Sequence, residues 1–210
     1  MERVKYGRTF HLPGSPGVSS DDKVLKSVSH FVGKRVIVTT KMDGECTTCY
    51  ADGYMHARSI DGNWHESRDW VKANIAPRIA HQIPASWRIC GENLYARHSI
   101  AYTDLPTFFM VFSIWGGNTA VSWDETVEWC RMLDLHTVPI LYDGMWDEKL
   151  IYGLWDNMNP ETDEGFVVRV ADQFTMDDFA TSLAKWVRAE HVQTEDKHWK
   201  RNWKPNSKSN

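Results

Sequence analysis

The chain has 210 residues, of which 42% are hydrophobic and 25% charged, enough for one globular domain with a substantial core. Its formal net charge of −4 excludes an overall positive field that would attract nucleic acid, so such contacts would need a local basic patch. No apolar run reaches about 18 residues and no secretory signal opens the chain, which predicts a soluble, cytoplasmic protein that contacts no membrane.

The first segment with a clear signal, residues 8–17, is punctuated by Pro and Gly and predicts an ordered surface loop. The same composition suits a loop that closes on a ligand, and the sequence leaves that alternative open. Next along the chain, Ser20 or Asp21 is placed to cap a short helix over residues 22–30.

A run rich in β-branched residues, 35–40, predicts a buried strand that ends at Lys41. A lysine in this position becomes a nucleophile where apolar walls or a neighbouring cation remove its proton. Asp43 offers the oxygen ligands that metal ions such as Mg²⁺ prefer, and Gly44 allows backbone to approach a ligand closely. An ordinary turn with solvated charges is the alternative for this short motif.

The next elements form an expected hairpin, with a returning strand over 46–51, an Asp-Gly turn, and a third strand over 54–58. Arg58 ends the third strand, where its fork of donors would grip a phosphate. The returning strand holds a C-x-x-C pair, Cys46 and Cys49, but no second pair accompanies it. We therefore expect reduced thiols rather than a zinc or redox centre.

Residues 67–82 carry apolar side chains along one side and predict a helix, and residues 87–94 predict a strand. Buried unpaired acids are rare, so an acid on this apolar strand, Glu92, is expected to face a ligand. Residues 108–115 form the most apolar run of the chain and predict a central strand. Aromatic residues in such a run belong to the core more often than to a stacking site.

In the second half of the chain, Ser122 opens a capping-box pattern that predicts a helix over 122–132. A short strand over 138–142 is expected to end in an Asp-Gly turn, followed by a helix over 147–156. Glu164 then heads a β-rich strand, which mirrors the lysine motif with a carboxylate in place of the amine. Residues 183–188 predict the last strand.

Cations alternate with tryptophans in residues 197–204, with no acid after residue 196. Basic side chains neutralise phosphates while indole rings stack on bases, which makes this segment a candidate nucleic-acid interface. A frayed, solvated terminus is the alternative. The candidate contact residues are Lys197, Trp199, Lys200, Arg201 and Trp203.

The order and spacing of these motifs over residues 35–188 resemble the covalent nucleotidyltransferases, and within them the ATP-dependent RNA ligase family. In that family the lysine of a K-x-D-G motif receives AMP, and Lys41 stands at that position. The family motif E-G-x-V-x-R matches residues 164–169 residue for residue. The last motif, usually K-x-K, keeps only its first lysine, Lys185, since Val187 occupies the second lysine position.

The resemblance also assigns roles to the other candidates. Arg58 matches the arginine of the next motif, Glu92 the glutamate that holds the ribose, and Phe112 the aromatic residue that stacks on adenine. Ser113 follows where many relatives have an acid. The implied nucleotide site comprises Thr40, Arg58, Glu92, Phe112, Glu164, Lys185 and Arg188, the last as a substitute for the missing lysine. The implied Mg²⁺ ligands are Asp43, Glu92 and Glu164.

The resemblance implies a minimal, phage-like RNA ligase that seals 5′-phosphate and 3′-hydroxyl RNA ends through lysyl-AMP and an adenylylated RNA end, with ATP as co-substrate and Mg²⁺. It implies an α+β fold, with antiparallel sheets flanked by helices in a nucleotidyltransferase domain over 1–190. Residues 191–210 would form a basic tail, too short for an OB-fold domain. We expect a monomer.

Two other functions stay open at this stage: a DNA nick or end ligase that borrows its missing module, and a nucleotide-binding module that has lost catalysis. The sequence also leaves open whether the substrate is a nicked duplex, a tRNA-like loop or single strands, and whether the source is a phage or a cell.

Overall fold

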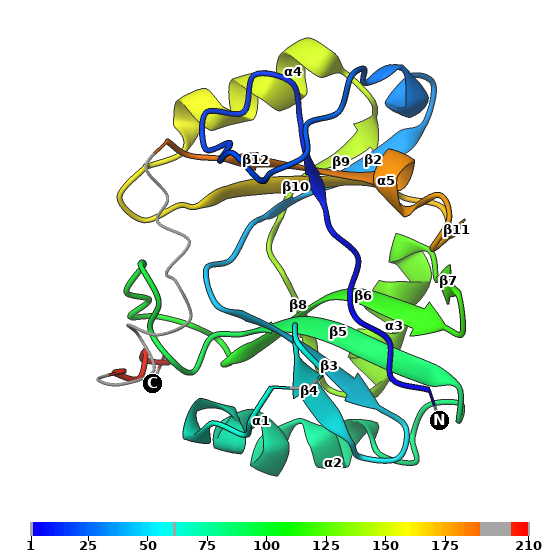
Figure 1. The fold of residues 1–210 in the computed structure, drawn as a ribbon, viewed down its shortest axis with the longest axis vertical. Coiled ribbons are helices and arrows are strands. Elements are labelled where there is room, and N and C mark those ends of the chain that lie inside the picture. The colour runs from blue at the N-terminus through cyan, green and yellow to red at the C-terminus, as the bar shows by residue number, and fades with distance from the viewer. Residues whose placement is uncertain (1, 61, 190–202, 210) are drawn as a thin grey trace.

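The computed structural model describes residues 2–60, 62–189 and 203–209. In these ranges two β-sheets face each other and helices lie on their outer sides (Figure 1). All strand pairs are antiparallel except two, β1 with β12 and β6 with β8. The predicted α+β class, with antiparallel sheets and flanking helices, is confirmed.

The first sheet has the strand order β1-β12-β10-β2-β9. Its strands are β1 (Phe10–His11), β2 (Arg35–Thr40), β9 (Ile140–Met145), β10 (Gly165–Val170) and β12 (Leu183–Val187). The strand that leads to the lysine motif, β2, therefore lies beside the strand that follows the glutamate motif, β10. These strands are far apart in the sequence, and the sheet makes them neighbours.

The second sheet has the order β11-β7-β6-β5-β3-β4, and β8 pairs with β6. Its strands are β3 (Glu45–Tyr50), β4 (Met55–Ala57), β5 (Trp87–Asn93), β6 (Phe109–Gly116), β7 (Thr119–Ala120), β8 (His136–Thr137) and β11 (Phe174–Thr175). The most apolar run of the sequence forms β6, which lies between β5 and β7 as the prediction of a central strand requires.

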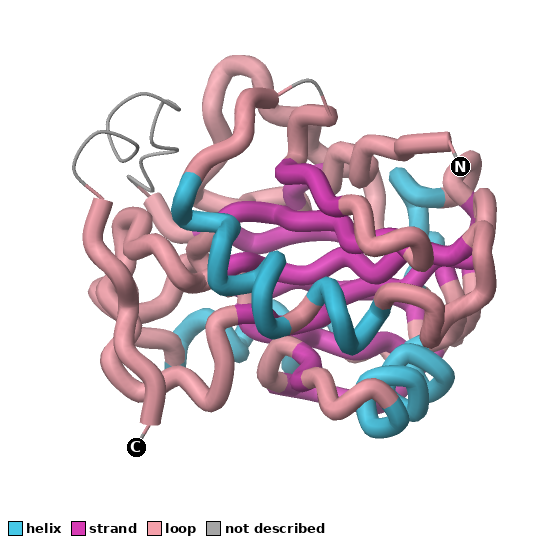
Figure 2. The backbone as a smooth tube through the Cα atoms, turned by 90° about the horizontal axis from the view of Figure 1, so that it is seen from below, coloured by secondary structure: helices cyan, strands magenta, loops and turns pink. Residues whose placement is uncertain are grey.

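The helices cover the outer faces of the two sheets (Figures 1 and 2). Helix α4 lies over the first sheet, α1 and α2 lie under the second, and α3 packs beside β6. Their bounds are α1 (Asp69–Asn74), α2 (Ala76–Ile79), α3 (Trp123–Met132), α4 (Glu148–Gly153) and α5 (Phe179–Ser182), with 3₁₀ turns η1 (Ser29–Phe31), η2 (Glu66–Arg68) and η3 (Leu154–Asn157).

The side chains of β2 and β10 alternate between two environments, as the period of two in a strand requires. Val38 and Phe166 are fully buried in a cluster that includes Ile151 of α4. Thr39 and Val167, on the opposite face, line a cavity between the sheets. The apolar face thus fixes the sheet to its helix, and the other face is left for a ligand.

The predicted helix over 22–30 is wrong. Residues 23–25 are extended and pair with β1, since the His11 amide donates to Lys23 O and the Leu25 amide donates to His11 O, both at 2.8 Å. Within 22–30 only Ser29 and His30 are helical, in the 3₁₀ turn η1. Asp22 accepts hydrogen bonds from the amide and hydroxyl of Ser19 at 3.1 and 2.7 Å. Polar residues near the predicted cap therefore close a turn, a use that competes with helix formation.

Two other predictions need correction. The helix predicted over 67–82 is divided into α1 and α2, because Pro77 in the first turn of α2 has no amide hydrogen to continue α1. The Asp-Gly turn expected at 143–144 is strand instead, since β9 continues to Met145 and Gly144 pairs with Val36. Ser122 caps α3 as predicted, because the Glu125 amide donates to Ser122 Oγ at 3.1 Å.

Residues 203–209 pack against the loop that follows β5. Asn206, which is 6% exposed, donates from Nδ2 to Leu94 O at 2.8 Å and accepts from the Tyr102 amide at 3.0 Å. Residues 190–202, which include the predicted domain boundary, lie outside the described residues. Among the described residues, no helix has the length and apolar character that a bilayer crossing requires.

Asn206→Ala should destabilise the protein by about 1–3 kcal/mol, because it leaves the Leu94 carbonyl and the Tyr102 amide without their buried partner. Ser207→Ala, a substitution at the exposed neighbouring residue, should change stability by less than about 0.5 kcal/mol. Urea unfolding of both variants measures the difference. Equal midpoints for Asn206→Ala and wild type would show that the C-terminal segment does not stabilise the domain.

Candidate active site

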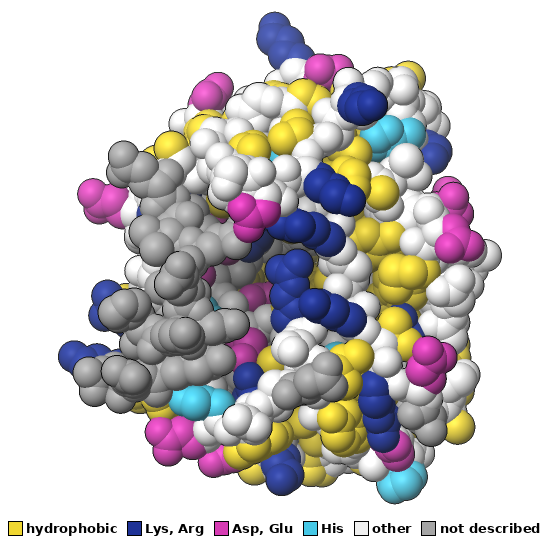
Figure 3. Space-filling model, viewed as in Figure 1, with side chains coloured by type: hydrophobic (Ala, Val, Ile, Leu, Met, Phe, Trp, Pro, Cys, Tyr) yellow, Lys and Arg dark blue, Asp and Glu magenta, His cyan; other side chains and the backbone are white. Residues whose placement is uncertain are grey.

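A cavity of about 840 Å³ lies between the two sheets and is lined by the residues that follow β2, precede β10 and flank β4. Lys and Arg side chains gather between the two layers on the face shown in Figure 3. Most of the predicted nucleotide and metal residues line this cavity: Thr40, Lys41, Asp43, Arg58, Glu92, Phe112, Glu164 and Lys185. Arg188 is not among the lining residues.

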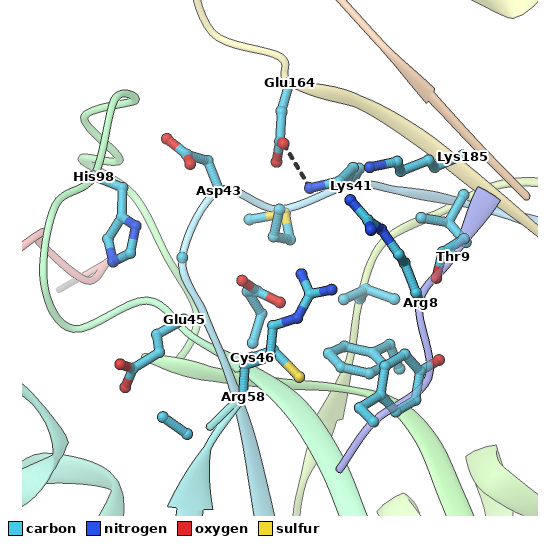
Figure 4. A pocket seen from close by; sticks show the side chains of 18 of the residues that line it. Arg8, Thr9, Lys41, Asp43, Glu45, Cys46, Arg58, His98, Glu164 and Lys185 are labelled. Carbon is cyan, nitrogen blue, oxygen red and sulfur yellow. Dashed lines mark hydrogen bonds and ion pairs between the residues drawn. The ribbon is translucent and has the colours of Figure 1, made fainter. Parts of the chain in front are cut away.

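The pairing of β2 with β10 brings the two central motifs together. Phe166 lies opposite Thr40, so the residues just beyond them, Lys41 and Glu164, meet at the same end of the sheet. Lys41 Nζ donates to Glu164 Oε1 at 2.5 Å, and the Lys41 amide donates to Gly165 O at 2.9 Å (Figure 4). The Glu164 side chain is 3% exposed and that of Lys41 is 27% exposed, so the carboxylate is shielded from water while the lysine faces the cavity.

Gly165 fits the glutamate motif for a conformational reason. Its φ is +148°, a value that favours glycine, and an added Cβ would lie 1.9 Å from Trp186 O. A side chain at this position would force β10 away from β12. The glycine after Glu164 therefore maintains the strand spacing that places the glutamate beside Lys41.

Lys41 rests as an ammonium group. Burial alone would lower the pKa of Lys41, but the charges of Glu164 and Glu92 and the hydrogen bond to Glu164 outweigh burial and raise the pKa above its usual value. The protonation state of Lys41 thus differs from the neutral form that apolar walls would produce. A reaction at this amine requires that the ion pair with Glu164 be opened or that the proton be transferred to a neighbouring base.

Glu92 reaches the same cavity from β5 of the opposite sheet. Burial is the main reason that the pKa of Glu92 is raised to about 8; Lys41 opposes this shift, while Glu164 and Asp43 add to it. The surroundings of this carboxyl group therefore favour its protonated form more than water does. A cation bound beside Glu92 would oppose this shift, because it favours the charged carboxylate.

Asp43 has a structural contact that the sequence did not reveal. Its Oδ2 accepts hydrogen bonds from Ser99 Oγ and the Ile100 amide, both at 2.7 Å. The Asp43 amide also donates to Tyr102 Oη at 2.9 Å. Asp43 therefore holds the loop after β5 against the cavity wall. Lys41, two residues earlier in the same motif, points into the cavity.

Gly44 was expected to allow close approach of a ligand, but its close neighbour is the protein itself. A Cβ at this position would lie 2.5 Å from Asn93 O and 2.9 Å from the side chain of Leu94. The glycine is thus required where β3 begins beside the end of β5. This packing constraint accounts for Gly44 without a ligand.

The acidic donor set fits a divalent cation such as Mg²⁺, which prefers carboxylate oxygens. Five carboxylates line the cavity: Asp22, Asp43, Glu45, Glu92 and Glu164. Among the described residues, no three acidic, histidine or cysteine side chains converge closely enough to form a complete ligand set. This arrangement agrees with Mg²⁺ chemistry, in which one or two carboxylates act together with phosphates and waters.

Cations face these acids from both sheets (Figure 4). Lys185 projects from β12, and Arg58 follows the end of β4. Arg8, from the segment before β1, lies beside Lys41 and Lys185 in the same view. Arg188 instead donates to the carbonyl of Pro160, outside the cavity lining. The missing second lysine of the last motif is therefore not replaced by Arg188 at the cavity wall in this arrangement.

Phe112 lies on the cavity wall in the middle of β6, and its ring makes an edge contact with Tyr6 at a centroid distance of 5.0 Å. Tyr6 belongs to the N-terminal segment, which carried no expected site residue. The half-buried ring of Phe112 leaves an aromatic surface facing the cavity, on the side opposite Val167 of β10. The two side chains have the apolar character that a nucleobase requires.

Two buried arginines were not among the predicted site residues. Arg68 makes a paired contact with Glu45, at 2.6 Å from Nε and 2.5 Å from Nη2, and both side chains line the cavity. Arg169 donates to Val121 O at 2.9 Å, and burial lowers its pKa to about 10. The final arginine of the E-G-x-V-x-R motif pointed to Arg169, but no local pattern indicated Arg68.

The C-x-x-C pair does not converge on one site. Cys46 and Cys49 lie three residues apart on β3 and so face opposite sides of the strand. Cys46 lines the cavity, whereas Cys49 packs in the core against α1 and α2. All four cysteines are free thiols.

Only one residue of the predicted nucleic-acid interface lies within the described residues. Trp203 donates from Nε1 to Glu66 Oε1 at 2.7 Å, and its ring lies 5.4 Å from that of Tyr95. Its indole therefore packs on the domain in this structure. The other predicted contacts, Lys197, Trp199, Lys200 and Arg201, lie outside the described residues.

The fold is that of known RNA ligase structures. A Naegleria gruberi RNA ligase mutant with AMP and Mn is 15% identical, with a TM-score of 0.59, over 88% of this chain and 56% of that chain. The same enzyme with PPi is 16% identical, with a TM-score of 0.57, over 89% of this chain and 61% of that chain. The chain thus spans little more than half the length of these relatives, and at this identity the likeness concerns the fold.

The family itself is identified by a second comparison. The family model described as RNA ligase matches residues 34–187, which is most of the chain. The chain therefore belongs to the RNA ligase family. A search of curated proteins finds no match. The matched range contains both central motifs and begins after the N-terminal segment that also contributes to the cavity.

Glu92→Gln should alter how stability depends on pH. The pKa of Glu92 is raised in the folded state from 4.5 to about 8, so wild type loses stability as pH rises through this window. The glutamine variant lacks this loss. At pH 9 with a chelator present, we expect its melting temperature to exceed that of wild type by at least ~2–4 °C, about 1 kcal/mol for a chain of this size.

The matched control is Glu125→Gln, which neutralises an exposed carboxylate in the first turn of α3. Its melting temperature should follow that of wild type through the same pH series. A parallel pH dependence for Glu92→Gln and wild type would contradict the raised pKa.

Proposed function

We propose that this protein is an ATP-dependent RNA ligase that joins 5′-phosphate and 3′-hydroxyl RNA ends through a covalent lysyl-AMP. The observation that supports this most directly is the contact of Lys41 with Glu164 at 2.5 Å, in a cavity large enough for a nucleotide. Membership of the RNA ligase family supports the choice of reaction and of RNA as substrate. Relatives solved with ATP and Mn support a nucleotide and a divalent cation.

In the first step, Lys41 Nζ attacks the α-phosphorus of ATP, a nitrogen–phosphorus bond forms, and the bond to the departing pyrophosphate breaks. The attacking amine must be neutral, and Glu164 is the nearest base, with its carboxylate in direct contact with the ammonium. Lys185 and Arg58 would stabilise the phosphate charges from the two sides of the cavity.

The next two steps transfer the nucleotide and release it. An oxygen of the RNA 5′-phosphate attacks the phosphorus of lysyl-AMP, which restores the free lysine and leaves an adenylylated RNA end. The RNA 3′-hydroxyl then attacks the 5′-phosphate, and AMP leaves as the phosphodiester forms. Thr40, Glu92 and Phe112 line the same cavity and are our candidates for contacts with the nucleoside.

Mg²⁺, when bound, would supply positive charge that neutralises phosphate oxygens and acidic side chains. Glu92 and Glu164 are our candidates for its protein ligands, because they line the cavity from opposite sheets. Asp43 is a weaker candidate for direct contact, since one of its oxygens already accepts two hydrogen bonds. Its effect on a cation would then be mainly electrostatic.

Lys41→Ala should abolish covalent labelling of the protein by ATP that carries label on the α-phosphate, because no nucleophile remains. Lys34→Ala removes an exposed lysine at the opposite end of β2, and this variant should label like wild type. The assay is a labelled protein band after incubation with Mg²⁺, with labelled GTP in parallel to test the nucleotide. Labelling of a folded Lys41→Ala protein would place the nucleophile elsewhere.

Basic residues of the C-terminal segment are proposed to hold RNA. Replacing Lys197, Lys200 and Arg201 with Gln should leave self-labelling nearly intact and weaken RNA binding. The slope of log affinity against log salt should become shallower by roughly 2, since each lost phosphate contact removes about 0.7. Sealing assays on nicked and single-stranded RNA, with DNA in parallel, measure the effect on each substrate.

The control variant replaces three cations elsewhere in the chain with Gln, namely the exposed Lys34, Arg131 and Lys149. It has the same net charge and should keep the salt slope of wild type. If both triple variants lose affinity equally, the total charge and not the C-terminal segment governs binding.

A further inference from the structure

The segment ahead of the family match contributes to the candidate active site. The match begins at residue 34, yet residues 5–9 and Asp22 line the cavity. This N-terminal strap, defined here as residues 3–25, crosses from the second sheet to the first and contributes β1 on the way (Figure 1). The cavity wall is therefore built partly by residues that lie outside the matched range.

Within the strap, Asp22 is the acid at the centre of a buried cluster. Its Oδ1 lies 3.3 Å from Lys185 Nζ, and its Oδ2 lies 3.3 Å from His11 Nε2. Arg8 approaches the same carboxylate at 3.9 Å. The Asp22 side chain is 3% exposed, and the amide and hydroxyl of Ser19 hold Oδ2 from the other side.

The cluster is also fixed to β12, the strand that carries Lys185. His11 Nδ1 lies 2.9 Å from Ser15 Oγ, which accepts a hydrogen bond from the Val187 amide at 3.0 Å. β1 pairs in parallel with β12, with His11 opposite Lys185. Asp22 is thus held at a defined place relative to the backbone of Lys185, which is what precise placement of a long, flexible side chain requires.

We propose that Asp22 is a positioning residue for Lys185. It holds the ammonium group of Lys185 at the cavity wall, where the phosphate oxygens of an incoming nucleotide can bind it. This inference rests on the proposed function. Lysine loses substantial rotamer freedom when it is fixed, so an ammonium group already held in place binds a phosphate at a lower entropic cost. Asp22 would act through Lys185 and would not touch the reacting atoms.

The charges around Lys185 support this role. Burial, followed by the nearby charge of Lys185, lowers the pKa of His11 to about 4, so His11 is neutral at pH 7. Burial also lowers the pKa of Lys185, Asp22 raises it, and the charge of Lys41 lowers it further, with Glu164 opposing. Asp22 is therefore the acid in direct contact with Lys185 that keeps it charged beside a second ammonium.

A purely structural role for Asp22 is the competing explanation, since its bonds to Ser19 also close the turn of the strap. The two roles differ in their dependence on Lys185. A positioning residue matters only while Lys185 is present, whereas a structural residue matters equally without it. A double-mutant cycle separates these cases.

The cycle consists of wild type, Asp22→Asn, Lys185→Met and the double variant, each assayed for the rate constant of lysyl-nucleotide formation and for KM. We expect Asp22→Asn to lower the rate constant at least 10-fold. In the Lys185→Met background the same change should have less than a 2-fold effect. Asp21→Asn removes an equal charge from the exposed neighbouring residue and should match wild type.

Equal losses from Asp22→Asn in both backgrounds, or none in either, would overturn the inference. Melting temperatures are measured on all variants, and if Asp22→Asn does not fold the cycle is repeated with Asp22→Glu. That variant keeps the charge but moves the carboxylate by one methylene group. It should slow labelling several-fold only when Lys185 is present.

Pyrophosphate binding, measured by calorimetry, provides a readout that does not require ligation. Asp22→Asn should weaken pyrophosphate affinity in the wild-type background and leave it unchanged in the Lys185→Met background. A wild-type protein that does not label with ATP or GTP would refute the proposed function, and the binding cycle would still test the role of Asp22. If wild type does label, and the losses caused by Asp22→Asn and Lys185→Met are additive in the double variant, only the role of Asp22 is refuted.

Discussion

The contact between Lys41 and Glu164 is the interaction on which the rest of the site depends. It forms because β2 and β10 pair in the register that sets Thr40 opposite Phe166, and Gly165 allows β10 to lie close to β12. The opposite charges of Lys41 and Glu164 stay paired in this partly buried cavity, since an unpaired buried charge costs several kcal/mol. The same pair keeps the Lys41 amine protonated. Under the proposed function, Lys41 is therefore unreactive until a bound nucleotide changes the charges around it.

The individual strands and motifs of this site were predictable from the sequence, but the contacts between them were not. Lys41 and Glu164 were identified because each adjoins a β-rich run, a local signal. Their contact depends on strand register, which is set by pairing partners more than 120 residues apart. Arg68 was missed for the same reason, because its partner Glu45 lies 23 residues away on another element.

The error at residues 22–30 shows why the N-terminal part of the site was hidden. Short polar residues near a predicted cap favour a helix start and a closed turn about equally, and tertiary contacts decide between them. Here the extended backbone pairs with β1, and the turn at Ser19 places Asp22 beside Lys185. A sequence pattern can indicate that a Pro/Gly segment is ordered, but which strand it will join depends on the completed sheet.

The N-terminal strap fastens the two sheets that form the cavity. At one end Arg3 packs over the rings of Tyr50 on β3 and Tyr54 in the turn before β4, and at the other end β1 pairs with β12 in the first sheet. Its exposed ion pairs contribute little, so aromatic packing, including the contact of Tyr6 with Phe112, supplies most of the attachment. The lysine and glutamate motifs lie at the end of the first sheet and Phe112 lies on the second, so under the proposed function the strap would set the spacing between the phosphate and base contacts. Under the proposed function, a segment outside the matched range would thereby control how this site fits its nucleotide.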